Sequence, residues 1–332
     1  MANVYDAILV VSFGGPEGKD DVIPFLENVL RGRNVPRERM LGVAKHYELF
    51  GGVSPINGQN RKLIAALQQE LETKGPQLPI YFGNRNWHPL LAETLGNMRD
   101  DGVKNALAFV TSAYSSYSSC RQYLEDIERA RALVGPDAPR VEKLRAFYNH
   151  PGFIEANVAN VRNALKQVPE DRRAGTRIVF TAHSIPDSMA RNCDYETQLR
   201  EASRLVAEDV GIENWQLVFQ SRSGSPAQPW LGPDICDYLR TADGIKDLVV
   251  APIGFVSDHM EIIYDLDTEA AALCRELGLN MIRAATAGTH PAFIEMIREL
   301  IRERIDPERP RRSLGTKGTR SDVCAPDCCS LV

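Results

Sequence analysis

Short apolar runs alternate with amphipathic segments along almost the whole of this 332-residue sequence. The runs are rich in Val, Ile and Leu, which is typical of buried strands, and the segments between them carry apolar residues at helical spacing. Strands that alternate with helices form parallel sheets joined by right-handed crossovers. We predict strands at residues 6–13, 78–83, 105–111, 140–147, 177–182, 215–220 and 248–256. We predict helices at residues 19–30, 61–74, 89–100, 124–133, 152–166, 194–210, 232–241 and 289–304, with a further helical stretch after residue 258.

This order of strands and helices restarts near residue 150. Because 332 residues are too many for one ordinary hydrophobic core, a duplicated α/β unit with a cleft between its halves is the simplest architecture. The halves are expected at residues 1–150 and 151–305, and a linker with a cysteine-rich tail is expected at residues 306–332.

Composition and charge argue against several classes of protein. A net charge of −5 is not that of a general nucleic-acid binder, and the longest apolar runs are too short for a membrane span. Gly14 and Gly15 follow the first strand, but neither G-x-G-x-x-G nor G-K-[ST] is present, so we expect no nucleotide loop. Seven scattered cysteines are not a disulfide framework. The N-terminus enters a strand without a basic region before it, which favours a cytoplasmic protein.

Polar side chains follow the ends of the predicted strands. The carboxyl ends of parallel strands meet at one edge of a sheet, where open α/β sheets keep their sites. His183 stands just past the strand at residues 177–182. A histidine in this place is either a structural residue or a candidate proton acceptor or metal ligand.

Three carboxylates lie along one face of the helical stretch after residue 258. Glu261, Asp265 and Glu269 are spaced at i, i+4 and i+8, and no Lys or Arg near them relieves their repulsion. Such a row is either a solvated acidic face or a set of oxygen ligands that passes divalent cations or relays protons. With only one nearby histidine, the group is a poor site for tight zinc binding and suits transient metal handling or proton abstraction.

Several segments together resemble ferrochelatase, the enzyme that inserts Fe²⁺ into a porphyrin. They occur in the family's order over residues 6–300, and the SYSSCRQY and FTAHSIPDSMA segments and the cysteine tail resemble the actinobacterial type. The matching segments are SFGGP (12–16), YELFGGVSPIN (47–57), RNWHP (85–89), SAYSSYSSCRQY (112–123), FTAHSIP (180–186), QSRSGSPAQPWLGPDI (220–235) and PIGFVSDHMEIIYDLD (252–267).

The resemblance implies two similar Rossmann-like halves that hold a porphyrin in the cleft without a nucleotide. It implies that His183 and Glu261 are the catalytic pair, which accept pyrrole protons or meet the metal. Asp265 and Glu269 would form the path for iron behind Glu261. Which member of the pair is the base and which is the metal donor stays open. The residues implied to bind the substrate are Phe13, Tyr47, Ser54, Arg85 and Tyr123.

The last residues form a Pro- and Arg-rich stretch that we expect to be an exposed linker. It ends in Cys324, Cys328 and Cys329, which can be a metal site, a redox pair or a disordered tail. Spacing does not choose a fourth ligand among the other cysteines. The resemblance implies a [2Fe–2S] cluster held by Cys120 and these three thiols.

Resemblance to the actinobacterial type implies coproporphyrin III as the substrate, with protoporphyrin IX as the alternative. A non-catalytic haem or metal carrier and a cobalt or nickel chelatase of the same fold are the other hypotheses. The expected partners are a porphyrin and ferrous iron, without nucleic acid and without a membrane span.

Overall fold

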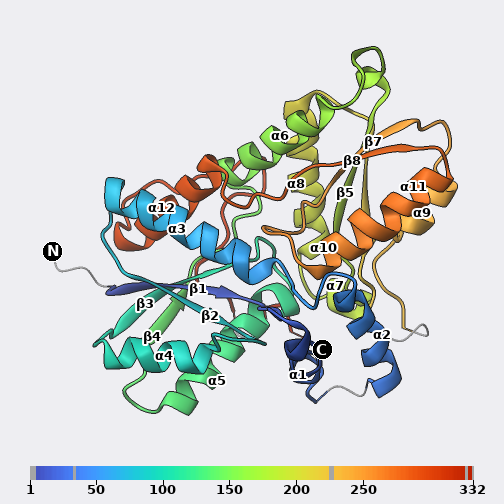
Figure 1. Ribbon diagram of the computed structural model, residues 1–332. Helices are drawn as coiled ribbons and strands as arrows, with labels where there is room; N and C mark the ends of the chain where they lie inside the picture. The colour runs from blue at the N-terminus through green and yellow to red at the C-terminus, as the bar shows by residue number, and fades with distance from the viewer. Residues whose placement is uncertain (1–4, 33–34, 224–227, 326–327, 331–332) are drawn as a thin grey trace. The chain divides into compact units, whose positions relative to one another are not determined.

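The computed structural model describes residues 5–32, 35–223, 228–325 and 328–330. The described chain forms two compact units. One contains the chain up to Thr111, Tyr123–Leu144 and Ser257–Met260, and the other contains Ser112–Gln122, Arg145–Val256 and the chain from Glu261 onward. Each unit is built around its own four-stranded sheet (Figure 1).

The first unit contains a parallel sheet with the strand order β2-β1-β3-β4. Strand β1 (AILVVS) is buried along its whole length because both faces of the sheet are covered, as its unbroken apolar sequence predicts. Alternate side chains of β1, such as Leu9, pack with Leu95 of α4 and Ile127 of α5 in one apolar core. Helix α3 lies on the other face (Figure 1). The elements are β1 (Ala7–Ser12), α1 (Val22–Val29), α2 (Arg37–Glu48), α3 (Ile56–Lys74), β2 (Ile80–Asn84), α4 (Leu91–Asp100), β3 (Asn105–Val110), α5 (Gln122–Val134) and β4 (Arg140–Lys143).

The second unit repeats this plan with the order β6-β5-β7-β8, again all parallel. Ile262 and Leu266, which precede α11, pack with Val179 of β5 on one face of the sheet. Helices α6 and α8 contact the strands from the other face, and α12 packs on α6. The elements are α6 (Pro151–Leu165), β5 (Arg177–His183), α7 (Asp187–Ala190), α8 (Tyr195–Val210), β6 (Trp215–Gln220), α9 (Ile235–Thr241), β7 (Asp247–Ala251), α10 (Met260–Tyr264), α11 (Ala271–Glu276), β8 (Asn280–Arg283) and α12 (Pro291–Ile305).

The two sheets have the same order relative to the chain, which confirms the prediction of two similar Rossmann-like halves with parallel sheets. Three details of the strands differ from the expected ones. Strand β7 ends at Ala251 because Pro252 cannot donate to the ladder. Gly254 then donates to the carbonyl of Thr181 at 3.0 Å, and a Cβ at Gly254 would lie 2.6 Å from the Cα of Ala182. The edge strand β8 was not predicted, and the strand predicted at 140–147 ends at Lys143.

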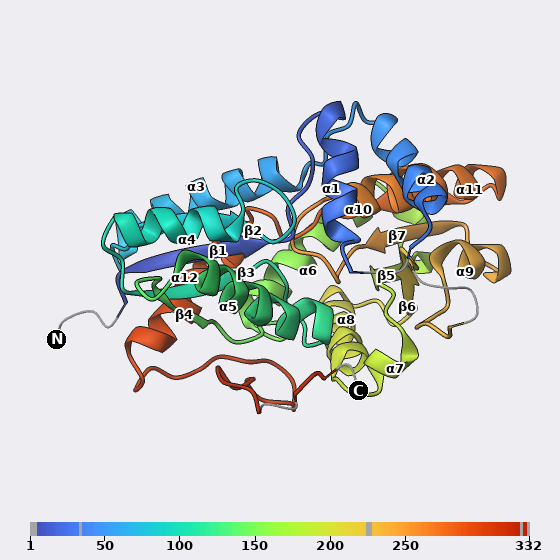
Figure 2. The ribbon, with the colours of Figure 1, turned by 90° about the horizontal axis from the view of Figure 1, so that it is seen from below.

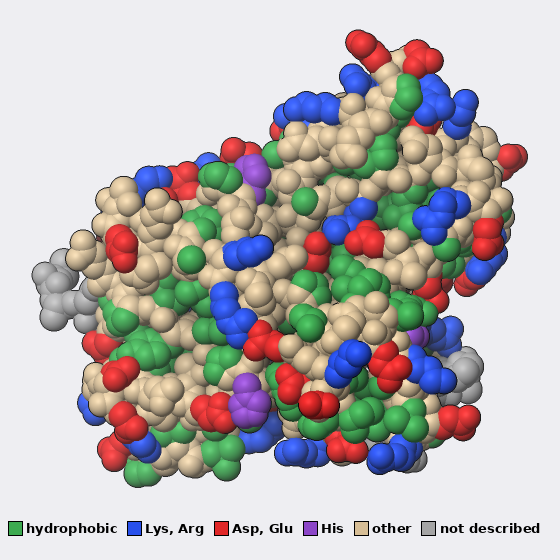
Figure 3. Space-filling view, in the orientation of Figure 1, with side chains coloured by type: hydrophobic (Ala, Val, Ile, Leu, Met, Phe, Trp, Pro, Cys, Tyr) green, Lys and Arg blue, Asp and Glu red, His purple; other side chains and the backbone are tan. Residues whose placement is uncertain are grey.

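Two segments near the predicted site residues are π-helical, Tyr117–Arg121 (η2) and Asp265–Ala270 (η4). Single π turns inside longer helices are frequent at functional sites. None of the helices in the described part of the chain is long and apolar enough to cross a membrane. Figure 2 shows the same elements from below, and Figure 3 shows acidic and basic side chains interspersed over the face that is turned to the viewer.

Candidate functional site

His183 and Glu261 lie side by side in the second unit. His183 is the last residue of β5, and Glu261 is in the first turn of α10. The Nε2 of His183 is 3.8 Å from Oε1 of Glu261, and both side chains are partly exposed, at 32% and 46%. The Nδ1 of His183 is 2.5 Å from the carbonyl oxygen of Ser184. Since a carbonyl only accepts, Nδ1 carries the proton and donates it, and the other ring nitrogen faces Glu261.

The acidic row continues from α10 into the π-helix η4. In an α-helix a turn takes about 3.6 residues, so position i+4 overshoots one turn. In a π-helix, whose hydrogen bonds run from i to i+5, position i+4 falls short of one turn. Because the step from Glu261 to Asp265 is α-helical and the step from Asp265 to Glu269 is π-helical, these drifts oppose each other. The two drifts are therefore expected to offset each other, and the alignment of the three side chains stays a prediction.

Neutral donors contact the carboxylate of Asp265, the middle residue of this row. The Ser221 hydroxyl donates to Oδ2 of Asp265 in a very short hydrogen bond, and Nε2 of Gln220 lies 3.4 Å from the same oxygen. Gln220 also donates to the backbone oxygen of Glu261 at 2.8 Å. Ser221 has φ of 61°, a left-handed conformation that a non-glycine residue rarely adopts. Backbone strain of this kind gathers at functional sites, and here it aims the hydroxyl at Asp265.

Glu269, at the far end of the row, is linked to Tyr264. Burial raises the pKa of the Tyr264 phenol, and the charge of Glu269 and a hydrogen bond to it raise that pKa further. The phenol therefore stays protonated and donates to Glu269. Uncharged donors hold a carboxylate in place without neutralising its negative charge. Such a carboxylate can still attract a hydrated divalent cation.

The residues predicted to bind the substrate lie in the first unit. The Arg85 side chain is only 5% exposed and pairs closely with Asp126. Its guanidinium lies 4.4 Å from the centre of the Tyr123 ring and 5.8 Å from that of Phe13, in cation–π geometry. Phe13 is 36% exposed and packs edge-on against Phe25.

Tyr47 and Ser54, like Tyr123, are buried. Tyr47 belongs to the same aromatic group, since its ring packs edge-on against Phe25. The positive charge of the Arg85 guanidinium is therefore paired with the Asp126 carboxylate, and the guanidinium packs against the rings of Tyr123 and Phe13. Of the five predicted residues, Phe13 offers the most open surface, and the roles of all five in substrate binding stay predictions.

The tail thiols Cys328 and Cys329 lie with their Sγ atoms 3.7 Å apart. Nη1 of Arg121, next to Cys120, donates to the carbonyl of Cys328 at 3.2 Å. Burial raises the pKa of the Cys329 thiol well above its usual range. The neighbouring thiols of Cys328, Cys120 and Cys193 raise this pKa further. Cys193, which the sequence did not mark, therefore belongs to this thiol neighbourhood.

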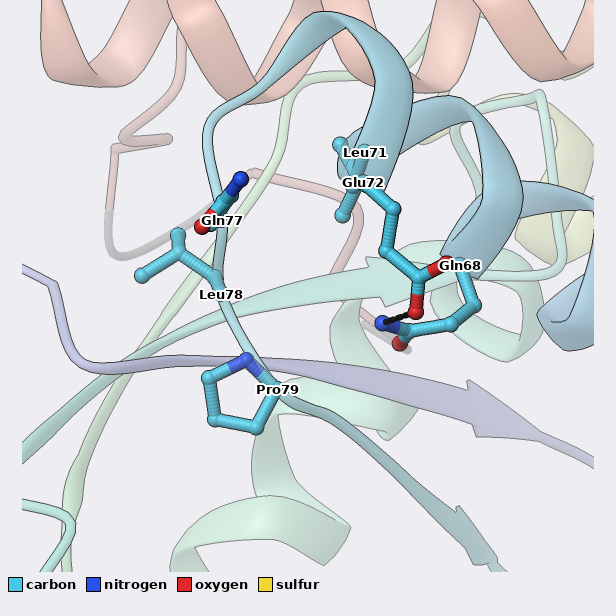
Figure 4. A pocket seen from close by; sticks show the side chains of 6 residues that line it. All are labelled: Gln68, Leu71, Glu72, Gln77, Leu78 and Pro79. Carbon is cyan, nitrogen blue, oxygen red and sulfur yellow. Dashed lines mark hydrogen bonds between the residues drawn. The ribbon is translucent and has the colours of Figure 1, made fainter.

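No group of three or more His, Cys, Asp or Glu side chains in the described part of the chain is arranged to hold a metal ion. Neither the acidic row nor the described tail thiols form such a group. A hollow of about 290 Å³ in the first unit is lined by Gln68, Leu71, Glu72, Gln77, Leu78 and Pro79 (Figure 4). It lies at the amino end of β2, the edge opposite to Arg85, and Gln68 donates to Glu72 along α3 at its wall. The hollow therefore has no part in the candidate site.

Comparison with known proteins decides the family. The ferrochelatase family model matches residues 5–305. The chain belongs to the ferrochelatase family. It is therefore a metal chelatase, and the predicted insertion of ferrous iron into a porphyrin in haem biosynthesis is confirmed at this level.

Named relatives cover nearly the whole chain. The ferrochelatase of Rhodopirellula baltica is 59% identical over 98% of this chain and 93% of its own length. Coproporphyrin III ferrochelatases of Streptomyces coelicolor and Nocardia farcinica are 49% and 50% identical, over 99% and 98% of this chain and 94% and 96% of their own.

Solved structures support the fold. The sirohydrochlorin chelatase SirB of Bacillus subtilis subspecies spizizenii, in complex with cobalt, matches with a TM-score of 0.55 at 11% identity, over 92% of this chain and 97% of its own. CbiX, the terminal enzyme of sirohaem biosynthesis in denitrifying bacteria, matches with a TM-score of 0.51 at 14% identity, over 89% of this chain and 98% of its own. Both likenesses concern the fold alone.

Proposed function

We propose that this ferrochelatase acts on coproporphyrin III and that His183 and Glu261 are its catalytic pair. The observation that carries the proposal is the approach of His183 Nε2 to Glu261 Oε1 at 3.8 Å, with Nδ1 fixed on the carbonyl of Ser184. The named relatives from Streptomyces and Nocardia support coproporphyrin III as the substrate. A cytoplasmic location stays a prediction.

Metal insertion requires two pyrrole N–H protons to leave while one Fe²⁺ enters. An imidazole whose Nδ1 is already protonated can accept a proton only at Nε2, the atom that faces Glu261. The carboxylate of Glu261 can accept the second proton or meet the ion. Asp265 and Glu269 stand behind Glu261, where oxygen ligands would hand a hydrated ferrous ion toward the pair.

The substrate assignment predicts a preference between two porphyrins. Coproporphyrin III carries two propionates where protoporphyrin IX carries vinyl groups. A site built to hydrogen-bond those carboxylates leaves donors unpaired when they are missing, so we expect kcat/KM for coproporphyrin III to exceed that for protoporphyrin IX by about tenfold or more. Anaerobic rates with Fe²⁺ and each porphyrin measure the ratio. Equal or inverted values would assign the enzyme to protoporphyrin IX.

We also propose that the tail holds a [2Fe–2S] cluster through Cys120, Cys324, Cys328 and Cys329. Two thiolates on one tetrahedral metal, each at about 2.3 Å, lie about 3.8 Å apart. The 3.7 Å between the Sγ atoms of Cys328 and Cys329 fits such a pair, and Cys120 is an electrostatic neighbour of Cys329. A cluster there would supply a one-electron redox centre, and its binding to the folded chain would add to stability.

Replacing Cys120 by serine is expected to abolish the visible absorbance of the purified or reconstituted protein above about 400 nm, since one of four cluster ligands is lost. Cys193→Ser is the matched control, because Cys193 lies near the same thiols and is outside the proposed set. It should keep the spectrum. Full absorbance in Cys120→Ser would contradict the assignment. If Cys193→Ser loses the absorbance and Cys324→Ser keeps it, the fourth ligand is Cys193 and not Cys324.

A further inference from the structure

Residues 306–323 run from the end of α12 toward the tail thiols, and we call this segment the strap. It is mostly exposed, as expected for a linker, but it is fastened at defined points along its length. Backbone N of Leu314 donates to the carbonyl of Asn149 at 2.8 Å. Nδ2 of Asn149, which is fully buried, donates back to the carbonyls of Leu314 at 3.2 Å and Gly318 at 2.9 Å. One asparagine thus holds two points of the strap that are four residues apart.

Charged residues hold the strap before and after the two residues that Asn149 contacts, Leu314 and Gly318. Nη1 of Arg312 donates to both carboxylate oxygens of Glu299 of α12, at 2.9 and 3.0 Å. The carbonyl of Arg312 accepts from Nη2 of Arg145, a buried side chain, at 3.0 Å. Farther along, Arg320 pairs with Asp194 at 2.7 Å. The exposed pairs are worth little singly, and the bonds to the buried Asn149 and Arg145 carry most of the docking.

Close approach to α8 adds a steric requirement at Gly315. This residue has φ of 71°, and a Cβ there would lie 1.9 Å from Oε1 of Glu201. Glu201 is not free to move aside without loss, because Arg204 holds both of its carboxylate oxygens at 3.0 Å. Gly318, in contrast, has φ of 65° with open space around it. Both glycines have a left-handed backbone conformation, but of the two a Cβ would clash with α8 at Gly315 and not at Gly318.

None of these contacts involves a thiol. We propose that the strap docks on Asn149, α12 and α8 in the absence of any metal, and so delivers the tail thiols to Cys120 before a cluster is built. The delivery rests on the proposed cluster, whereas the docking does not. If the tail were disordered, cluster assembly would have to order about twenty residues, and this loss of conformational entropy would weaken binding. In a docked strap these residues are already ordered, so cluster assembly does not carry that cost.

Limited trypsin digestion followed by mass spectrometry tests the docking, because Arg311, Arg312, Lys317 and Arg320 are cleavage sites inside the strap. Cleavage requires local release of the chain and reports the population of the released state. We expect equal protection of the strap in protein as purified, in protein stripped of metal with a chelator, and in Cys120→Ser. Asn149→Asp removes two bonds from a buried donor, so it should be cut about ten to a hundred times faster.

Two matched controls separate docking from general loss of stability. Asn157→Asp alters a buried amide whose Nδ2 donates within α6, to the carbonyl of Phe153 at 2.8 Å, and should leave the strap protected. Gly318→Ala should likewise be cut much more slowly than Gly315→Ala. The proposal is overturned if stripping the metal or Cys120→Ser exposes the strap as much as Asn149→Asp does, or if Asn149→Asp leaves it protected.

The cluster is read separately, by absorbance after reconstitution with iron and sulfide. We expect Asn149→Asp to recover markedly less absorbance than Asn157→Asp, since its thiols are not delivered. Equal recovery in the two variants would overturn the delivery step. If wild-type protein never absorbs above about 400 nm, the cluster itself is refuted, and the digestion still decides whether the strap is docked.

Discussion

Glu261→Gln is expected to lower kcat for iron insertion by about 10²–10⁴-fold, the range for loss of a positioned proton acceptor. Glutamine keeps the shape of the side chain but carries no charge and accepts no proton, so the effect reports chemistry and not packing. His183→Ala should fall in the same range because it removes the ring nitrogen that lies 3.8 Å from Glu261 Oε1. Initial rates of metalloporphyrin formation under anaerobic conditions give the ratio.

The control for charge removal is Glu276→Gln, an exposed glutamate at the end of α11. It should retain the wild-type rate. Porphyrin fluorescence titration should show that Glu261→Gln still binds the substrate, which places the defect after binding. If Glu261→Gln keeps more than about half of the wild-type kcat, Glu261 has no part in proton transfer or metal delivery.

Arg145→Met is expected to lower the free energy of unfolding by about 3–5 kcal/mol, because it leaves a buried carboxylate without its partner. Arg145 and Glu303 are almost fully buried, with side chains 1% and 3% exposed, and they form two hydrogen bonds of 2.7 and 2.9 Å. Such a loss is a large part of the stability of an ordinary domain. Urea unfolding followed by circular dichroism measures it.

The double variant Arg145→Met with Glu303→Leu is the matched comparison. Replacing both charges by apolar groups removes the uncompensated carboxylate, so most of the lost stability should return. A double variant that is as unstable as the single one would show that the damage comes from lost packing and from the carbonyl of Arg312, not from the stranded charge of Glu303.

The fold was predictable from the sequence because its strands are buried on both faces. Strand β1 is apolar at every position except its last, and β7 is apolar after its first residue, so length and composition alone mark them. Strand β8 is a short, half-buried edge strand, which lacks that signal. The end of β7 depends on tertiary partners, such as the Thr181 carbonyl that accepts from Gly254. The spacing of apolar residues in the sequence does not specify such partners.

The site was predictable in part. The position of His183 at a strand end and the spacing of the acidic residues follow from the sequence, whereas pairing His183 with Glu261 required the family resemblance. The left-handed Ser221 that donates to Asp265 was not predictable, because nothing in QSRSG marks a serine with positive φ. The π turn at Asp265 was also missed, since i, i+4 spacing is compatible with both helix types.

The strap shows why polar segments are hard to predict. Its Arg and Pro content indicates exposure, and the segment is mostly exposed. Its anchors, however, are its own backbone carbonyls and Asn149, a buried asparagine in the turn before α6. Hydrogen bonds to carbonyls leave no pattern in the sequence of the segment that receives them. Cys193 was missed for a similar reason, because its thiol neighbours Cys328 and Cys329 are distant in sequence.

The central claim is that this chain catalyses iron insertion and does not merely carry its product. The most direct measurement is anaerobic mixing of wild-type protein with a large excess of coproporphyrin III and Fe²⁺, followed by porphyrin absorbance. We expect many equivalents of iron porphyrin per protein chain, formed at a rate that falls by about 10²–10⁴-fold in Glu261→Gln. Formation or capture of one equivalent and no more, with the same amplitude in Glu261→Gln, would contradict it and identify a carrier.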